Sequence, residues 1–343
     1  MRPLLLLPLL LATGPGPGLA REGLVLVEAE GFAQRGGWVV DPQFMDLMGS
    51  PYLLAHGLGR PVADATTAVV VPTAGRYRVW VRTMDWVARR QAPGTPGRFH
   101  LLVGGRPLAA AFGTVGAEWH WQDGGFVELP AGRVALALRD LTGFEGRCDA
   151  ILFARDPGFT PPNRDPALAV FRRNCLGLPE QPEPAGEFDF VVTGGGIAGT
   201  CAALTAARLG LKVALVQDRP VLGGNNSSEV RVWLQGARNE EPWPNIGNVV
   251  AELEQDDRAH YGPANRAELY EDEKKLAVVR AEPNITLLLE HRVNAVETAS
   301  GPPPRITAVI AQSTLTGRRR RLAARWFADC TGDATVGALA GAD

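Results

Sequence analysis

The feature that most constrains the fold is a glycine-rich turn between a short apolar run and an alanine-rich segment. Residues 188–193 form a nearly continuous apolar run, as expected of a parallel strand that is buried on both faces. This run leads into the glycine-rich residues 194–199, and a helix-favouring stretch follows over residues 200–209. A second apolar run occupies residues 212–216. This order predicts a strand–turn–helix–strand unit of the kind that binds a dinucleotide.

The three glycines of the G-x-G-x-x-G pattern are Gly194, Gly196 and Gly199. The first allows the tight turn, the second lets the backbone approach a pyrophosphate, and the third lets the helix pack closely on the strand. At the end of the second predicted strand, where an acidic residue usually accepts the ribose hydroxyls, the sequence has Gln217 followed by Asp218. We expect either that Gln217 accepts one hydrogen bond without carrying a charge, or that Asp218 takes the place of the acidic residue.

Two further motifs follow in order along the chain. A second glycine-rich loop contains Gly223, Gly224 and Asn225, and a predicted strand over residues 325–333 ends in Thr331, Gly332 and Asp333. With these motifs the segment 187–343 resembles the FAD-dependent oxidoreductases of the glutathione-reductase-like two-dinucleotide-fold superfamily, especially the group of the heterodisulfide reductase flavin subunit. The resemblance implies FAD as cofactor.

The same resemblance assigns roles to these motifs. It places the Gly223–Gly224 loop beside FAD, closes the Thr-Gly-Asp segment over the dinucleotide, and brings backbone groups around Val293 to the adenine. Iron–sulfur relatives hold their clusters through closely spaced cysteines, and this sequence has none. Because the superfamily has later elements that contact the flavin, we expect an α/β Rossmann-like FAD-binding domain that is incomplete at its C-terminal end. Glu229 and Arg231 are either near the flavin ring or alternating strand residues, so the catalytic residues stay unassigned.

The first part of the chain has a different pattern, with short β-rich runs separated by turn signals. The runs occupy residues 24–27, 67–71, 77–83, 99–103, 134–138 and 150–153. Residues 76–82 alternate between polar and apolar with period two, as in a strand with one buried face. The pattern predicts an all-β sandwich.

This sandwich resembles the jelly-roll carbohydrate-binding modules of the family-6 and family-35 type. The resemblance rests on residues 27–30, 72–77 and 148–152. It implies a structural calcium ion on Glu28, Glu30 and Asp149, for which hard oxygen ligands are suited. The alternative is two exposed glutamates that flank a buried Ala29. The tryptophans at positions 38, 86, 119 and 121 are available either for stacking on sugars or for core packing.

The chain begins with a basic Arg2, an apolar run over residues 4–12 and a small-residue ending at Ala20. This is typical of a secretory signal peptide, and it predicts a secreted or periplasmic protein without a transmembrane segment after signal removal. Cys148 and Cys175 are a candidate disulfide pair, because disulfides form in that compartment. The four cysteines are too sparse for a disulfide scaffold or a metal cluster.

The sequence therefore predicts four regions. These are a signal peptide over residues 1–20, a β-sandwich over 21–158, a linker rich in proline and glutamate over 159–186, and a truncated FAD-binding Rossmann-type domain over 187–343. A net charge of −2 with 21% charged residues gives no broad basic field, so nucleic acid is not an expected partner.

The functional prediction combines the two domains. We expect a secreted FAD-dependent oxidoreductase that transfers a hydride to the flavin from a small molecule, which the sandwich suggests is glycan-derived. The alternative is an extracellular carbohydrate-binding protein whose flavin domain is inactive.

Overall fold

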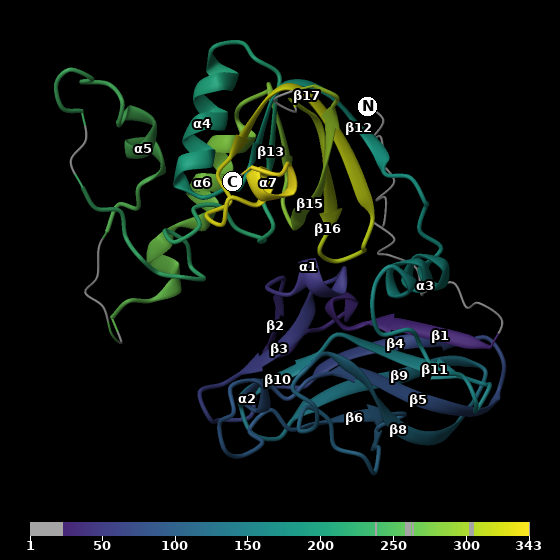
Figure 1. The fold of residues 1–343 in the computed structure, drawn as a ribbon. Helices are drawn as coiled ribbons and strands as arrows, with labels where there is room; N and C mark the ends of the chain where they lie inside the picture. Colours follow the sequence, from purple (N-terminus) through teal and green to yellow (C-terminus); the bar gives the residue numbers. More distant parts are fainter. Residues whose placement is uncertain (1–22, 237–238, 258–261, 263, 302–304, 343) are drawn as a thin grey trace, which may run out of the picture. The chain divides into compact units, whose positions relative to one another are not determined.

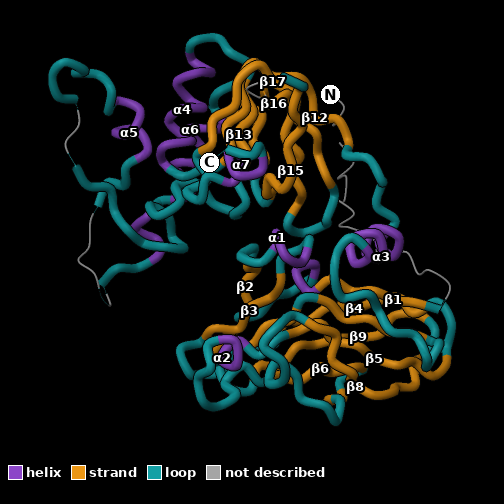
Figure 2. The backbone as a smooth tube through the Cα atoms, in the orientation of Figure 1, coloured by secondary structure: helices purple, strands orange, loops and turns teal. Residues whose placement is uncertain are grey.

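The computed structural model describes residues 23–236, 239–257, 262, 264–301 and 305–342, so the expected signal peptide lies outside the described residues. The chain divides into two compact units. The first holds residues 1–41 and 52–178, and the second holds residues 42–51 and 179–343. Figures 1 and 2 show that the first unit is built mainly of strands, whereas strands and helices share the second.

The first unit is a sandwich of antiparallel strands. One sheet has the order β1 (Leu24–Glu28), β11 (Ala150–Ala154), β5 (Gly75–Thr83) and β8 (His120–Leu129). A second has the order β4 (Ala65–Val71), β9 (Gly132–Asp140), β6 (Phe99–Val103) and β7 (Arg106–Pro107). A three-stranded sheet joins β10 (Phe144–Cys148), β3 (Tyr52–His56) and β2 (Trp38–Asp41). The short helices η1 (Ala29–Gly31) and α2 (Trp86–Arg89) lie between strands.

Alternation along β5 divides its side chains between two apolar clusters. Tyr77, Val79 and Val81 point into the main core, where they meet residues of β1, β4, β6, β9 and β11. Trp80 points the other way and joins a cluster that covers the outer face of the sheet. Both faces of the strand are therefore buried from Trp80 onward, whereas Arg76 is exposed and Arg78 is half-buried, as the period-two pattern predicted.

The outer face of this sheet is covered by α3 (Ala167–Leu176). Leu168, Phe171 and Cys175 of the helix pack on Trp80 and on Leu152 of the sheet. The helix ends at Gly177, which has the left-handed conformation (φ 62°) that suits glycine at this position. The helix α3 therefore packs as part of the first unit, although it lies within the segment predicted to be a linker.

The second unit is built on a six-stranded sheet. Its order is β14 (Ile285–Leu288), β13 (Val213–Val216), β12 (Glu183–Thr193), β17 (Arg319–Asp329), β16 (Arg305–Ser313) and β15 (His291–Ala299). The first four strands are parallel, and β16 and β15 are antiparallel to their neighbours. The helices are α1 (Met45–Met48), α4 (Ile197–Arg208), α5 (Asn248–Leu253), η2 (Ala267–Tyr270), α6 (Asp272–Arg280) and α7 (Thr335–Leu339).

Each face of the parallel strands has its own apolar cluster. On one face, Val192, Val213 and Leu215 pack against residues of α4, α5 and α6, and Figure 1 shows α4 and α6 beside the strands. On the other face, Val191 and Val216 pack against residues of β15, β16, β17 and α7. Burial on both faces explains why the strands are continuous apolar runs. The structure confirms the predicted order of a β-sandwich followed by a Rossmann-like α/β domain.

Three segments differ from what their local sequence pattern suggests. Residues 183–186 belong to β12 and pair with β17, with a register irregularity between Pro184 and Gly186, although their proline content argued against a ladder. The arginine-rich residues 319–321 begin β17, which is an inner strand and not an edge. Residues 229–235 form no strand.

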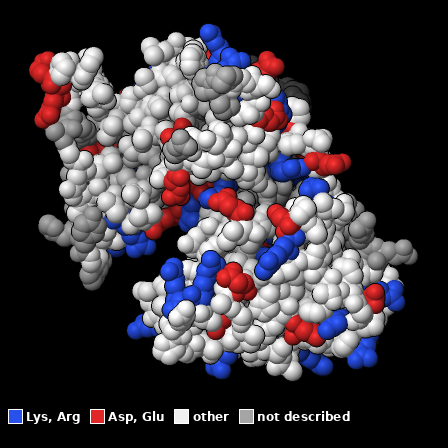
Figure 3. Space-filling view, in the orientation of Figure 1, with Lys and Arg blue, Asp and Glu red and all other residues white. Residues whose placement is uncertain are grey.

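Two further observations concern the whole described chain. None of the four cysteines forms a disulfide, and all four lie within the described residues, so the candidate pair of Cys148 and Cys175 is not linked. Across the described ranges, no helix has the length and apolar character needed to cross a membrane. On the face drawn in Figure 3, acidic and basic side chains are interspersed on each unit.

Candidate functional site

The second unit contains a cavity of about 730 Å³ at the carboxyl ends of β12, β13 and β17. Open α/β sheets bind ligands at this edge of their strands. The cavity is lined by most of the residues that the sequence singled out: Gly194, Gly196, Gln217, Asp218, Gly223, Gly224, Asn225, Val293, Thr331, Gly332 and Asp333. The fold thus brings four separate segments of the chain to one cavity.

The three fingerprint glycines differ in what a side chain would meet. A Cβ on Gly194 would lie 2.2 Å from the carbonyl oxygen of Cys330, and one on Gly199 would lie 1.9 Å from that of Gly194. These two glycines let the turn, α4 and β17 approach each other closely. A Cβ on Gly196 would meet no atom within 4 Å, although this residue lines the cavity. Gly196 therefore leaves space for a ligand at the N-terminal end of α4.

The second glycine-rich loop lies directly against the first. The N–H of Gly223 donates to the carbonyl oxygen of Gly195 at 2.8 Å, and Gly196 pairs with Gly223 as a parallel bridge. Gly223 and Gly224 have φ of 107° and 59°, in the left-handed range that favours glycine. A Cβ on Gly224 would lie 3.1 Å from the Cα of Gly196. The two loops form one continuous wall of the cavity.

Gln217 and Asp218 are placed differently although they are neighbours. The Gln217 side chain is turned inward: its Oε1 accepts from the N–H of Gly195 at 2.8 Å, and its Nε2 donates to the carbonyl oxygen of Val221 at 3.1 Å. The carboxylate of Asp218 lies 3.5 Å from the guanidinium of Arg292. Burial raises the pKa of Asp218, and the charge of Arg292 opposes this effect.

The segment after β17 supplies a further part of the cavity lining. Asp329 accepts hydrogen bonds from the N–H groups of Thr331 and Gly337, at 3.2 Å and 2.9 Å. These bonds join the loop after β17 to α7. The loop carries Thr331, Gly332 and Asp333 into the cavity lining.

Sequence reasoning missed part of the lining. Trp233, Leu234 and Gln235 line the cavity from a segment that has no regular structure and therefore no periodic signal. Glu229 lines it as well, paired with Arg219 at 2.7 Å. Arg231 donates to the carbonyl oxygen of Ser228 and is not among the lining residues.

Residues 189–343 match the protein family described as FAD dependent oxidoreductase. The match covers less than half of the chain and lies within the second unit. The matched residues include the fingerprint, the second glycine loop and the end of β17. A search of the curated proteins finds no match to the chain.

Three of the solved structures that are similar to this chain have the following identity, coverage and TM-score. THI4 of Thermovibrio ammonificans is 17% identical, with 46% of this chain and 64% of that chain covered and a TM-score of 0.31. The GH26-CBM35 β-(1,4)-mannanase of Podospora anserina is 16% identical, with 78% and 65% covered and a TM-score of 0.32. A family 35 carbohydrate binding module of Clostridium thermocellum is 21% identical, with 38% and 97% covered and a TM-score of 0.30. The chain spans less than two thirds of the length of the first two proteins.

The cavity of the second unit fits a dinucleotide. The empty space beside Gly196 leaves room for a pyrophosphate. The N–H groups in the first turn of α4 can donate hydrogen bonds to the negatively charged oxygens of that pyrophosphate. Asp218 provides a carboxylate at the strand end where ribose hydroxyls bind in such folds. The residues present therefore suit FAD.

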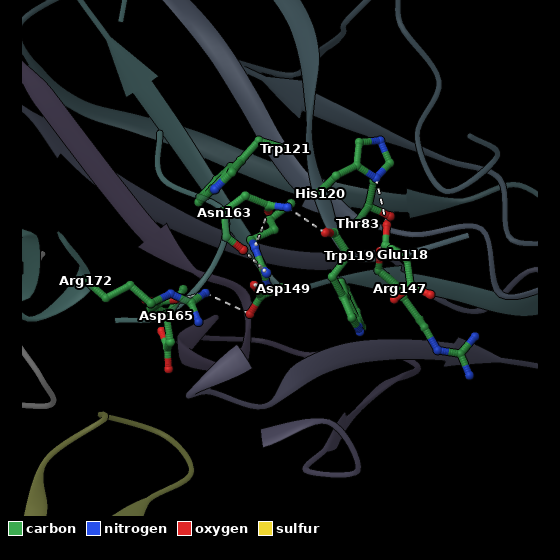
Figure 4. Close-up of polar contacts among 12 residues, drawn as sticks. Thr83, Glu118, Trp119, His120, Trp121, Arg147, Asp149, Asn163, Asp165 and Arg172 are labelled. Carbon is green, nitrogen blue, oxygen red and sulfur yellow. Dashed lines mark hydrogen bonds and ion pairs between the residues drawn. The ribbon is translucent and has the colours of Figure 1, made fainter. Parts of the chain in front are cut away.

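The residues expected to hold calcium do not fit that ion. Glu28 and Asp149 come together, but the guanidinium of Arg172 lies between them, with Nη2 at 2.9 Å from Glu28 Oε2 and 2.8 Å from Asp149 Oδ1. Arg82 approaches the second oxygen of Asp149 at 2.7 Å. Figure 4 shows the Arg172 side chain reaching Asp149. Among the described residues, no group of three or more His, Cys, Asp or Glu side chains is arranged to hold a metal.

The alternative for these residues, two exposed glutamates, does not describe them either. Glu30 is 3% exposed, and burial, followed by the charge of Glu28, raises its pKa well above the ordinary value. Burial also raises the pKa of Glu28 to about 7, against the opposing charge of Arg172. For Asp149 burial acts in the same direction, but Arg172 and then Arg82 lower its pKa below the ordinary value.

The tryptophans proposed for sugar stacking are mostly in the interior. Trp38, Trp119 and Trp121 are buried, and Trp121 donates its indole N–H to the carbonyl oxygen of Pro162. Trp86 is half-buried and lies between the guanidinium groups of Arg90 and Arg147, at 4.7 Å and 4.6 Å from its ring. Core packing accounts for the first three.

Proposed function

We propose that this protein is an exported FAD-dependent oxidoreductase that removes a hydride from a small, glycan-derived molecule. The observation that carries the proposal is the cavity at the carboxyl ends of β12, β13 and β17, because two interlocked glycine loops and a helix N-terminus line it together. FAD, when bound, supplies the hydride acceptor.

The chain's own residues bind and orient the cofactor in this proposal. The first turn of α4 donates backbone N–H groups to the pyrophosphate, and Gly196 keeps the approach open. Asp218 accepts the ribose hydroxyls, and backbone groups around Val293 meet the adenine. The loop with Thr331, Gly332 and Asp333 lines the same cavity and closes over the dinucleotide.

Two features of the chain support export and a glycan-derived substrate. The first residues have the basic, apolar and small-residue order of a secretory signal. A β-sandwich similar to carbohydrate-binding modules lies on the same chain as the flavin domain, which favours a substrate that occurs near polysaccharides. The sandwich would hold the enzyme at that source.

A visible absorption spectrum of the purified full-length protein tests the proposal. We expect the two bands of an oxidised flavin, and we expect both to bleach without oxygen when a substrate from a panel of oligosaccharides and sugar alcohols is added. A colourless protein that binds glycans would instead support a carbohydrate-binding protein with an inactive flavin domain.

A further inference from the structure

Gln217 lies at the strand end at which related dinucleotide folds place a ribose-binding acid, and it lines the cavity, yet backbone groups already use both polar atoms of its side chain. It is 5% exposed, and both of its polar atoms have backbone partners. Oε1 accepts from the N–H of Gly195, and Nε2 donates to the carbonyl oxygen of Val221. Its backbone is fixed as well, since its N–H donates to Leu288 and its carbonyl accepts from His291.

These two side-chain bonds connect the segments that form the cavity wall. Gly195 is the middle residue of the fingerprint turn, and Val221 opens the second glycine loop. The carbonyl of Gly195 accepts from the N–H of Gly223 at 2.8 Å and from the hydroxyl of Thr200 at 3.1 Å. Gln217 therefore holds the fingerprint turn from one side while the second loop holds it from the other.

We propose that Gln217 is a positioning residue for the cofactor: its carboxamide fixes the two glycine loops in register, and the ribose contact passes to Asp218. The inference rests on the proposed FAD-binding function. A carboxamide satisfies both partners at any ordinary pH, because its oxygen accepts from the N–H of Gly195 while its NH2 group donates to the carbonyl of Val221. An ionised carboxylate accepts from Gly195 but repels the carbonyl of Val221, and an alkyl side chain leaves both groups unpaired.

The test measures FAD affinity of the full-length chain, after removal and return of the cofactor, for Gln217→Leu and Gln217→Glu. We expect Gln217→Leu to weaken FAD binding by about tenfold or more, since the variant loses the two buried hydrogen bonds that hold the two glycine loops of the cavity wall. Gln312→Leu is the matched control. Gln312 is also buried, accepts from Asn294 at 2.8 Å and donates to the carbonyl of Gly49 at 2.6 Å, but lies outside the cavity lining.

A pH series separates positioning from a general loss of stability. For Gln217→Glu, we expect the ratio of its dissociation constant to that of wild type to approach one at low pH, where the introduced carboxyl is protonated and can donate to Val221. The ratio should grow as pH rises and the carboxyl ionises. The charged and titratable groups around the position are Asp218, Arg219, Glu229, His291 and Arg292, and wild type shares all of them.

The outcomes are distinguishable. If the wild-type chain binds no FAD, the proposed function fails. If wild type binds FAD and Gln217→Leu binds it equally tightly, the positioning role is wrong and the proposed function stands. A ratio for Gln217→Glu that does not change with pH also overturns the positioning role, and this measurement still decides the question if Gln217→Leu fails to fold.

A second observation, in the first unit, carries a separate inference. Arg172 of α3 is 5% exposed and bonds Glu28 and Asp149, residues of β1 and of the turn before β11. Oε2 of Glu30, in the same cluster, has no hydrogen-bond partner among the described residues. The cluster therefore contains three carboxyl groups, those of Glu28, Glu30 and Asp149. Two guanidinium groups, those of Arg82 and Arg172, supply its positive charge.

We infer that the Arg172 guanidinium takes the place of a structural cation, so that the first unit folds without a metal and α3 is fixed to the sandwich. An arginine can do this because its planar guanidinium presents several donors at once and stays charged at any ordinary pH. The apolar face of the same helix, with Leu168, Phe171 and Cys175, holds the guanidinium in place against the sheet.

Thermal melting of the full-length chain with EDTA or with Ca²⁺ tests the inference. We expect neither to change the melting temperature of wild type, and we expect Arg172→Ala to lower it by more than about 5 °C because buried carboxylates lose their partner. Arg172→Ala should then regain stability with Ca²⁺, since Glu28 and one oxygen of Asp149 lose the cation that pairs with them. Arg78→Ala is the control, because Arg78 pairs with Asp123 at the surface.

Two results would overturn this inference. A lower melting temperature of wild type in EDTA would mean that the sandwich holds a metal. Equal stability of Arg172→Ala and wild type would mean that the guanidinium stabilises nothing. If Arg172→Ala does not fold, metal analysis of the purified wild type decides, with bound calcium at one ion per chain contradicting the inference.

Discussion

The carboxylate of Asp218 and the guanidinium of Arg292 lie 3.5 Å apart, between the end of β13 and the start of β15. A second nitrogen of Arg292 reaches Asp46 at 2.9 Å. Arg292 therefore holds two carboxylates, one of which lines the cavity. This pairing favours the ionised form of Asp218, against the effect of burial on its pKa. An ionised carboxylate is the stronger acceptor for ribose hydroxyls.

Replacement of Asp218 should weaken the cofactor site without unfolding it. We expect Asp218→Asn to lower FAD affinity by about tenfold to a hundredfold, because a hydrogen bond to a charged group contributes about 1.5–3 kcal/mol. Calorimetric titration of FAD into the cofactor-free chain measures this. Asp256→Asn is the control, since Asp256 pairs with Lys274 and does not line the cavity. An unchanged affinity for Asp218→Asn would remove Asp218 from the site.

Gly196 gives a test of where the pyrophosphate lies. Its backbone has φ −62°, which other residues adopt, and a Cβ there meets no protein atom within 4 Å. We expect Gly196→Val to fold normally and to lose FAD from the purified protein, because the side chain fills the cradle. Gly199→Ala is the contrasting variant: its Cβ would lie 1.9 Å from a backbone oxygen, so we expect it to destabilise the whole second unit. Full flavin occupancy in Gly196→Val would show that the fingerprint is placed wrongly.

The sequence was most informative where local pattern and tertiary position agree. The strand–turn–helix–strand unit around Gly196 was predictable, because the glycine spacing reports backbone geometry and the apolar runs report burial on both faces. Several sandwich strands were missed. β8 contains Gly124 and Gly125 after Asp123, which reads as a turn, yet the structure has a register irregularity there and the strand continues. Pro184 likewise suggests a break in the chain's regular structure, yet β12 runs through it and pairs with β17, with a register irregularity between Pro184 and Gly186.

The roles of Gln217 and Arg172 could not be read from the sequence. Gln217 lies at the position of an expected ligand group, and only the fold shows that its carboxamide is used by Gly195 and Val221. Arg172 is separated from Glu28 by 144 positions along the chain, so no spacing rule connects them. Both cases depend on which polar groups the fold brings together, and a local pattern does not contain that information.

The position at which the mature chain begins tests the predicted signal peptide. We expect cleavage after Ala20, because a small-residue ending follows the apolar run over residues 4–12, and the mature chain should begin at Arg21. Expression with secretion, followed by mass spectrometry of the intact protein, measures the mass of the N-terminal segment that was removed. Ala20→Arg is a suitable variant, since a large charged residue at the cleavage site should block processing. A secreted protein that keeps Met1 would contradict the prediction.

The acidic cluster of the first unit makes stability depend on pH with a definite sign. In the unfolded chain Glu28 and Glu30 lose their protons near their ordinary pKa of 4.5, whereas in the folded chain burial raises both values, to about 7 for Glu28. Between these values the folded state binds more protons, so the contribution to stability is fully present below pH 4.5 and is lost as pH rises through the folded pKa values. Each group can contribute at most about 1.4 kcal/mol per pH unit in this window.

We expect Glu30→Gln to reduce the fall in melting temperature between pH 5 and about pH 8, and the exposed Glu118→Gln to leave it unchanged. Melting curves of the three full-length proteins across this range decide it, and an identical pH dependence for Glu30→Gln and wild type would mean that Glu30 is ionised in the folded protein.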